Sequence, residues 1–201
     1  LDALLGFLDQ PGVDPVAAHD RVYGLLSSSE CTPHETTYCP QTFSVYRSGR
    51  LADIAGFYQA FGVSASRDQP ERVDHIALEL EFMAWLLAKV EHLRGSTDAG
   101  AAEQAEICCD AQQRFFEEHL AWWVPAYAGA LWMRTEGTPG PVGASDAPKT
   151  FHGALAQVLA SFVPAERELL GVAPPQELVE PLPTADTEAP DCQGCEVPAS
   201  G

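Results

Sequence analysis

Basic residues are scarce in this sequence. Lysine and arginine together number 11 against 29 aspartates and glutamates, which gives the 201-residue chain a formal net charge of −18 at neutral pH. This balance argues against a nucleic-acid-binding protein, because a strongly negative surface repels phosphates. It suits a basic partner segment, although solubility alone explains an acidic surface equally well.

Long apolar runs and internal repeats are also missing. No stretch approaches the roughly 20 apolar residues that span a bilayer, so we expect no membrane span. The length fits one domain, or one domain plus a tail. The six cysteines, two of them adjacent at Cys108 and Cys109, do not resemble the framework of a small secreted domain. No signal peptide is recognised either, so we expect a cytoplasmic location.

The residue patterns of several common enzyme sites are absent. A di-iron site needs Glu-x-x-His pairs on two helices, whereas His75 and Glu79 form a single pair four residues apart. There is neither a His-Glu-x-x-His run nor a glycine-rich phosphate loop. Cys108 and Cys109 follow acidic residues in a predicted helix, a setting that favours buried structural thiols over nucleophiles. We therefore predict no enzyme activity and no cofactor.

Cys192 and Cys195 form a Cys-x-x-Cys pair near the end of the chain. A zinc or iron–sulfur site needs two more ligands, which Cys31, Cys39 or a second chain would have to supply. The alternative is a reduced, mobile tail that binds no metal. The sequence leaves both readings open.

Apolar periodicity, caps and breakers predict an all-α protein with a single helical-bundle domain. The central helix is expected over Asp68–Arg94, with Asp68 as its N-cap and Pro70 in its first turn. Its apolar residues surround the whole axis, so most of its faces should be buried. Other helices are expected over 1–8, 14–26, 48–61, 99–121, 125–133, 150–162 and 164–170, with a break at 122–125 and a long loop over 27–47.

The end of the chain differs in composition. From 172 to 201 the sequence holds six prolines, six acidic residues and no basic one. Such a segment cannot bury enough apolar surface to fold. We therefore divide the chain into a helical domain over 1–171 and a disordered acidic tail over 172–201.

Four phrases in the sequence resemble one known family. They are TPHETTY at 32–38, LADIAGFYQAFGV at 51–63, PERVDHIALELEFMAWLLAK at 70–89 and FFEEHLAWWVPAYAGAL at 115–131. Their order and spacing are similar to those of the TorD/DmsD/NarJ family of redox-enzyme maturation chaperones. Within that family, the chain looks most like delta-type chaperones of molybdenum enzymes related to dimethyl sulfoxide reductase, such as selenate or chlorate reductase.

The resemblance implies an all-helical cytoplasmic chaperone that is not a catalyst. Family members bind the apo catalytic subunit of the oxidoreductase, its twin-arginine signal peptide, or both, until the molybdopterin cofactor is inserted before export. They occur as monomers or as helix-exchanged dimers. The alternative is an accessory subunit that stays in the mature oxidoreductase and uses Cys192 and Cys195 in a metal or redox role.

The family's Glu-Pro-x-Asp-His signature maps onto Glu71, Asp74 and His75, with Arg72 where proline is usual. Carboxylates suit the two cations of a twin-arginine signal, and aromatic side chains suit the apolar stretch that follows. We expect client contacts from seven residues: Asp74, His75, Glu71, Glu79, Glu35, Tyr38 and Tyr58.

A purely structural reading of this motif is the alternative. In it, His75 bonds Glu79 one helical turn away, Asp74 favours the helix N-terminus, and nothing binds there. The client-binding reading predicts that Asp74→Ala or His75→Ala leaves the fold intact but weakens client binding.

Overall fold

Helices make up the regular structure of the chain. The computed structural model describes residues 2–8, 14–24, 31–39, 44–64, 66, 70–137 and 147–174. Their elements in chain order are α1 (Asp2–Leu8), α2 (Pro15–Tyr23), the 3₁₀ turn η1 (Glu35–Thr37), α3 (Ser44–Ala60), α4 (Ile76–Arg94), α5 (Ala101–Phe115), the π-helical segment η2 (Phe116–Leu120), α6 (Ala121–Glu136) and α7 (Phe151–Leu170). Over these described ranges, the one β-type pairing is an isolated bridge between His34 and His75. The all-α prediction is confirmed.

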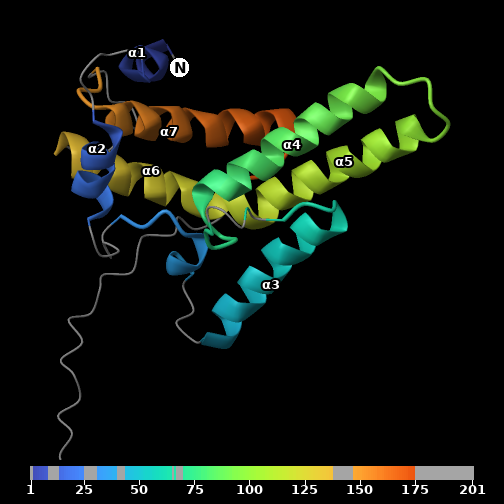
Figure 1. The fold of residues 1–201 in the computed structure, drawn as a ribbon, viewed down its shortest axis with the longest axis horizontal. Helices are drawn as coiled ribbons and strands as arrows, with labels where there is room; N and C mark the ends of the chain where they lie inside the picture. The colour runs from blue at the N-terminus through green and yellow to red at the C-terminus, as the bar shows by residue number, and fades with distance from the viewer. Residues whose placement is uncertain are drawn as a thin grey trace, which may run out of the picture.

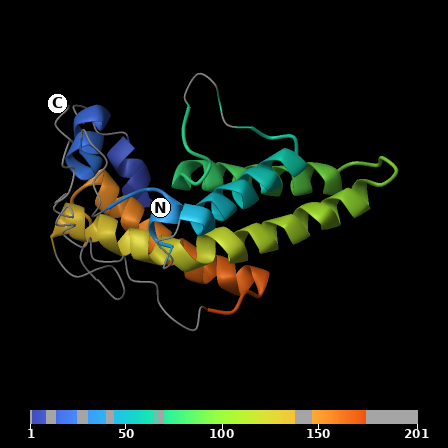
Figure 2. The same cartoon turned by 90° about the horizontal axis from the view of Figure 1, so that it is seen from below.

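Two packed helix pairs form the body of the molecule. Helices α4 and α5 run antiparallel, α6 continues the line of α5, and α7 lies along α6 (Figure 1). Viewed from below, α3 lies over the α4–α5 pair (Figure 2). Phe57 of α3 packs edge-to-face on Phe115 of α5, with ring centroids 5.2 Å apart, and Phe115 packs on Phe82 of α4 at 4.8 Å. The aromatic core therefore joins all three helices.

Helix α4 begins later than the sequence predicts. Its first residue is Ile76, and its N-cap is His75, whose Nδ1 accepts the Ala77 N–H at 3.1 Å. The preceding backbone pairs with the segment before η1 instead of coiling: the Glu35 N–H bonds the Asp74 carbonyl at 3.0 Å, and the Ile76 N–H bonds the Pro33 carbonyl at 2.9 Å. The predicted start at Asp68 is wrong, because these long-range hydrogen bonds outweigh the local signals.

Helices α5 and α6 form one continuous rod through η2. The predicted break at 122–125 is wrong, since Pro125 lies inside α6. Proline has no N–H to donate to the carbonyl four residues earlier. Here that carbonyl belongs to Ala121, and the guanidinium of Arg167 donates to it instead. A side chain from α7 thus satisfies the acceptor that Pro125 leaves free.

The C-terminal helix is also longer than expected. A single helix, α7, replaces the predicted pair over 150–162 and 164–170, and Pro164 lies within it. The Thr150 hydroxyl caps it by accepting the Gly153 N–H at 2.9 Å. Val172 is 8% exposed and packs with the core. The rest of the predicted tail, from 175 onward, lies outside the described residues, as do Cys192 and Cys195.

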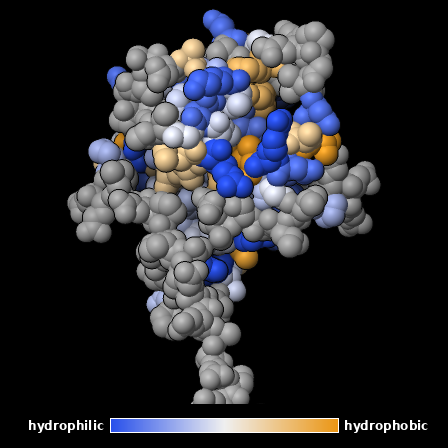
Figure 3. Space-filling model, turned by 90° about the vertical axis from the view of Figure 1, so that its left-hand side faces the viewer, coloured by the Kyte–Doolittle hydropathy of each residue, from blue (hydrophilic) through white to orange (hydrophobic). Residues whose placement is uncertain are grey.

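The described surface offers no bilayer-spanning segment. Among the helices of the described ranges, none is both long and apolar enough to cross a membrane. On the face nearest α1 and α2, hydrophobic and hydrophilic residues are interspersed among those coloured in Figure 3, without one large apolar patch.

Candidate functional site

The chain forms a tight corner where residues 33–37 meet 72–76. Asp74 is fully buried there, and its Oδ2 accepts three hydrogen bonds: from the Thr36 N–H at 3.1 Å, the Thr36 hydroxyl at 2.7 Å and Arg72 Nη2 at 2.8 Å. Arg72 also donates to the Thr36 hydroxyl at 2.7 Å. The arginine that stands where the family has proline therefore supplies the cation that pairs with the buried Asp74 carboxylate.

His75 and Glu71 lie on the accessible side of this corner. The His75 ring packs edge-to-face on His34 at 5.2 Å between centroids, and His34 Nε2 lies 3.4 Å from Glu71 Oε1. Partial burial lowers the pKa of His75, although nearby Glu71 acts in the opposite direction. Partial burial acts to raise the pKa of Glu71. The Arg72 N–H, His34 and His75 outweigh it and lower that pKa, which keeps Glu71 ionised.

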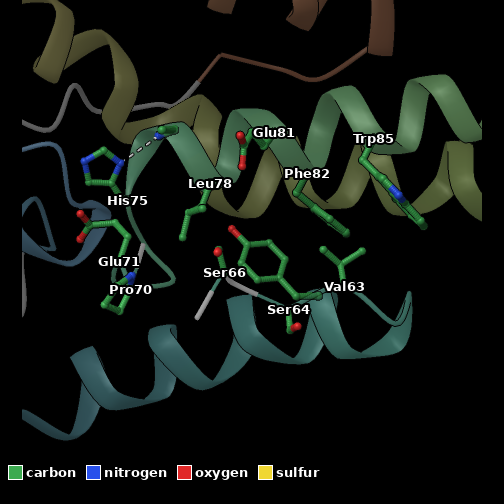
Figure 4. Close-up of a pocket in the computed structure, with 12 residues that line it drawn as sticks. Val63, Ser64, Ser66, Pro70, Glu71, His75, Leu78, Glu81, Phe82 and Trp85 are labelled. Carbon is green, nitrogen blue, oxygen red and sulfur yellow. Dashed lines mark hydrogen bonds between the residues drawn. The ribbon is translucent and has the colours of Figure 1, made fainter. Parts of the chain in front are cut away.

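An elongated groove of about 730 Å³ runs from this corner along α4. Leu78, Phe82 and Trp85 extend from α4 toward α3 and form its apolar wall (Figure 4). Glu71 and His75 stand at one end, and Glu81 lies on α4 above Leu78. The remaining lining includes Tyr58, Val63, Ser64, Ser66, Pro70 and Ala77. The groove thus combines an apolar wall with exposed carboxylates.

A buried polar network lies behind the corner. Glu35, Glu79 and His119 are all 0% exposed. Glu35 Oε2 lies 3.0 Å from His119 Nδ1, and the Trp123 indole N–H donates to Glu79 Oε2 at 3.3 Å. Burial and the neighbouring Glu35 raise the pKa of Glu79 well above its ordinary value, which favours the neutral acid at this position. Arg50 Nη1 approaches Glu35 Oε1 at 3.5 Å from the solvent side.

The structure sorts the seven predicted client contacts into two layers. Glu71, His75 and Tyr58 line the groove, and the Tyr58 hydroxyl donates to the Val73 carbonyl at 3.0 Å. Behind it lie Asp74, Glu79, Glu35 and Tyr38, all buried, and Tyr38 packs on the Trp123 ring at 5.3 Å. The buried carboxylates have no exposed surface in this conformation. The side chain of Asp74 holds the corner, whereas those of Glu35 and Glu79 contact His119 and Trp123 in the network behind it.

Sequence analysis does not identify several residues of the site. Leu78, Phe82 and Trp85 follow the spacing of one helix face, but the all-round apolar pattern of α4 hides that face. His119 shows no signal in the sequence, because its partner Glu35 lies 84 residues away. Arg72 is visible only as a departure from the family's signature, which does not reveal that it pairs with Asp74. The side chains of His75 and Glu79 do not form the pair that the purely structural reading assumes: Glu79 bonds Trp123, and the His75 ring caps α4.

Comparison with known proteins shows which family the chain resembles. A family profile described as nitrate reductase delta subunit matches residues 16–128. The selenate reductase assembly chaperone protein of Thauera selenatis is 30% identical over 175 residues, which are 82% of this chain and 78% of that protein. The chlorate reductase assembly chaperone protein of Ideonella dechloratans is 32% identical over 130 residues, 64% of this chain and 56% of that protein.

A shorter match links the chain to TorD. The chaperone protein TorD of Vibrio cholerae (strain M66-2) is 32% identical over 69 residues, 34% of this chain and 29% of that protein. No solved structure gives a significant match. The chlorate reductase chaperone is matched over little more than half of its own length.

The family profile covers more than half of the chain, and the alignment with the selenate reductase chaperone covers most of it. Two relatives are named for selenate and chlorate reductases, the enzyme types that the sequence resemblance singles out. The chain therefore belongs to the nitrate reductase delta subunit family, in agreement with its resemblance to NarJ- and TorD-type chaperones.

Proposed function

We propose that this protein is a system-specific assembly chaperone for the catalytic subunit of a molybdenum oxidoreductase. It binds the apo subunit, its twin-arginine signal peptide, or both, in the cytoplasm before export. The names of its relatives support this function, since all those described above are chaperones and two serve named reductases. Its role is to bind a client, without catalysing a reaction.

The observation that carries the proposal is the groove along α4. Ionised Glu71 and exposed Glu81 lie beside the apolar wall of Leu78, Phe82 and Trp85. A twin-arginine signal presents two permanent cations and then an apolar stretch, and guanidinium groups pair well with carboxylates. The groove offers both kinds of contact: Glu71 lies at one end, before α4 begins, and Glu81 lies on α4 between Leu78 and Phe82. The signal peptide is therefore the client segment that it fits.

The binding mode is tested with a fluorescent peptide that carries two arginines followed by an apolar stretch. Glu71→Gln and Glu81→Gln should each weaken its binding to the full chain by about tenfold, equivalent to about 1.4 kcal/mol. Glu91→Gln is the matched control, because Glu91 is exposed on α4 beyond the groove and should not affect affinity. Equal affinities for all three variants and the unchanged chain would overturn this binding mode.

Identification of the client separates the chaperone from an accessory subunit. The tagged chain is recovered from its own cells with and without molybdenum, and its partners are identified by mass spectrometry. A chaperone should bring down mainly the cofactor-free catalytic subunit. Equal recovery of the cofactor-loaded enzyme would favour an accessory subunit, and recovery of no oxidoreductase subunit would refute the proposal.

A further inference from the structure

A second cluster of ligand-type side chains lies on the other side of Glu35, away from the groove. Asp53 of α3 and Glu118 and His119 of η2 each offer one ligand-type atom, and these atoms lie within 4.8 Å of one another. His119 is 0% exposed, whereas the side chains of Asp53 and Glu118 are 54% and 38% exposed. One buried imidazole therefore faces two carboxylates at the surface.

The orientation of His119 is the feature that points to a ligand. Its Nδ1 is held by Glu35 Oε2 at 3.0 Å, while its buried Nε2 has no hydrogen-bond partner. A neutral imidazole that donates from Nδ1 carries its lone pair on Nε2. A carboxylate that fixes the far nitrogen of a metal-binding histidine is a recurring feature of metal centres. In the tautomer that donates from Nδ1 to Glu35, the ring would direct the Nε2 lone pair toward the carboxylate of Asp53.

The distance between His119 and Asp53 also suits a metal ion. His119 Nε2 and Asp53 Oδ2 are 3.5 Å apart, longer than a good hydrogen bond. Ligand atoms on a tetrahedral ion with bonds of about 2.0–2.1 Å are separated by about 3.3 Å. Arg114 donates to Oε1 of Glu118 at 3.4 Å, so the other carboxylate oxygen, Oε2, is the one assigned to the ion.

The local backbone brings the ligands together. In the π-helical η2 the Ala121 N–H bonds the carbonyl of Phe116, five residues back, which widens the turn that carries Glu118 and His119. Segments of this kind are rare and occur frequently at functional sites. Arg50 of α3 anchors the same turn by donating to the Glu118 carbonyl at 2.6 Å.

We propose that Asp53, Glu118 and His119 form a binding site for a divalent first-row transition-metal ion, with Glu35 as a positioning residue. Imidazole with two carboxylates is a ligand set for ions such as Zn²⁺ and Co²⁺. Three protein ligands leave one position for water, and the bound ion ties α3 to η2. This site is distinct from the groove and goes beyond the proposed chaperone function.

Cobalt(II) titration of the full chain tests the site. Every sample carries Cys192→Ser and Cys195→Ser so that this thiol pair does not compete for the ion. We expect one equivalent of Co²⁺ to give weak visible d–d bands without the intense near-ultraviolet band of thiolate ligation. Asp53→Asn should weaken Co²⁺ binding at least tenfold, since even partners of metal ligands contribute 10–100-fold. Glu117→Gln, an exposed neighbour in η2 outside the cluster, should leave it unchanged.

Thermal unfolding gives an independent readout. Co²⁺ at saturating concentration should raise the Tm of the chain whose proposed site is unchanged and the Tm of the Glu117→Gln variant. It should not raise the Tm of the Asp53→Asn variant. Circular dichroism without metal checks that Asp53→Asn is folded, which its exposed position favours. Absence of Co²⁺ uptake, a thiolate spectrum, or equal affinities for Asp53→Asn and Glu117→Gln would overturn the proposal.

Discussion

One carboxylate oxygen, Oδ2 of Asp74, organises the corner beside the groove. It accepts from the N–H and hydroxyl of Thr36 and from Arg72, all within 3.1 Å. This acceptor is costly to remove, because the buried N–H and hydroxyl of Thr36 then lose their partner in a place that water does not reach, whereas the half-exposed Arg72 can still be hydrated. Asp74 therefore holds the backbone that carries Glu71 and His75, and its own side chain is fully buried.

Asp74→Ala should consequently lower the free energy of unfolding by about 2–4 kcal/mol. This expectation replaces the intact fold that the sequence alone suggests for this variant. Urea unfolding measures the change, and Asp98→Ala is a control at an exposed aspartate in the α4–α5 connection. A stability equal to that of the unchanged chain would contradict the structural role.

The stability contribution of Glu79 should depend on pH. Burial and Glu35 raise its folded pKa above the ordinary 4.5, so the folded state holds this proton more tightly than the unfolded state. That contribution is fully present below about pH 4.5 and is lost as the pH rises through the folded pKa. Glu79→Gln keeps an acceptor for the Trp123 N–H and removes the charge. Its unfolding free energy relative to the unchanged chain should therefore increase with pH above about 4.5, by at most about 1.4 kcal/mol per pH unit.

Urea unfolding of Glu79→Gln and of the unchanged chain is measured between about pH 4 and about pH 8, which covers the range in which the folded state is expected to lose the Glu79 proton. Glu91→Gln provides the comparison, since Glu91 is exposed on the same helix. Its difference from the unchanged chain should stay flat across the series. A flat difference for Glu79→Gln as well would show that Glu79 does not titrate as the buried contact with Glu35 requires.

At the scale of helices, α6 depends on a side chain from α7. Arg167 donates to the carbonyl of Ala121, which Pro125 leaves without an N–H partner. Burial also lowers the pKa of Arg167, so this guanidinium lies in a poorly solvated position where its hydrogen bonds matter. The continuity of the rod from α5 into α6 is therefore tied to the docking of α7.

A double-mutant cycle tests this link. Arg167→Ala leaves the Ala121 carbonyl unsatisfied and should destabilise the chain by about 1–3 kcal/mol. Pro125→Ala in the same background should recover part of the loss, because the new N–H lies four residues from that carbonyl. Pro164→Ala, within α7, should not recover it. Equal effects of the two proline substitutions, measured by urea unfolding, would contradict the mechanism.

At the scale of the whole molecule, the net charge should speed the encounter with the proposed client. The formal net charge of −18 attracts a cationic peptide over distances comparable to the screening length of the solution. Attraction of this kind raises the association rate more than it slows dissociation. It should act on any basic client segment, whereas the proposed contacts in the groove should fix where that segment binds.

The association rate constant of a twin-arginine peptide should fall about tenfold between about 20 mM and about 500 mM salt. The dissociation rate constant should change much less. Stopped-flow fluorescence measures both rates. A peptide with glutamine in place of both arginines is the control and should show little salt dependence. A steep salt dependence of dissociation alone would contradict electrostatic steering.

Several features follow from the sequence alone because they depend on near neighbours. Asp14 caps α2 by accepting the N–H groups of Val16 and Ala17, two and three residues away, as its position before Pro15 predicts. The all-α fold likewise follows from the short-range periodicity of apolar residues. The family resemblance follows from four short segments of the sequence. The sequence also points to Glu71 and His75, which line the groove.

Other features are decided only by tertiary structure, because the interacting groups lie far apart in the chain. Asp74 meets Thr36 across 38 residues, Trp123 meets Glu79 across 44, and Arg167 meets Ala121 across 46. These contacts set the start of α4, the burial of Glu79 and the passage of α6 through Pro125. Local propensity cannot anticipate them, since each depends on a hydrogen bond whose partner becomes available only when the helices pack.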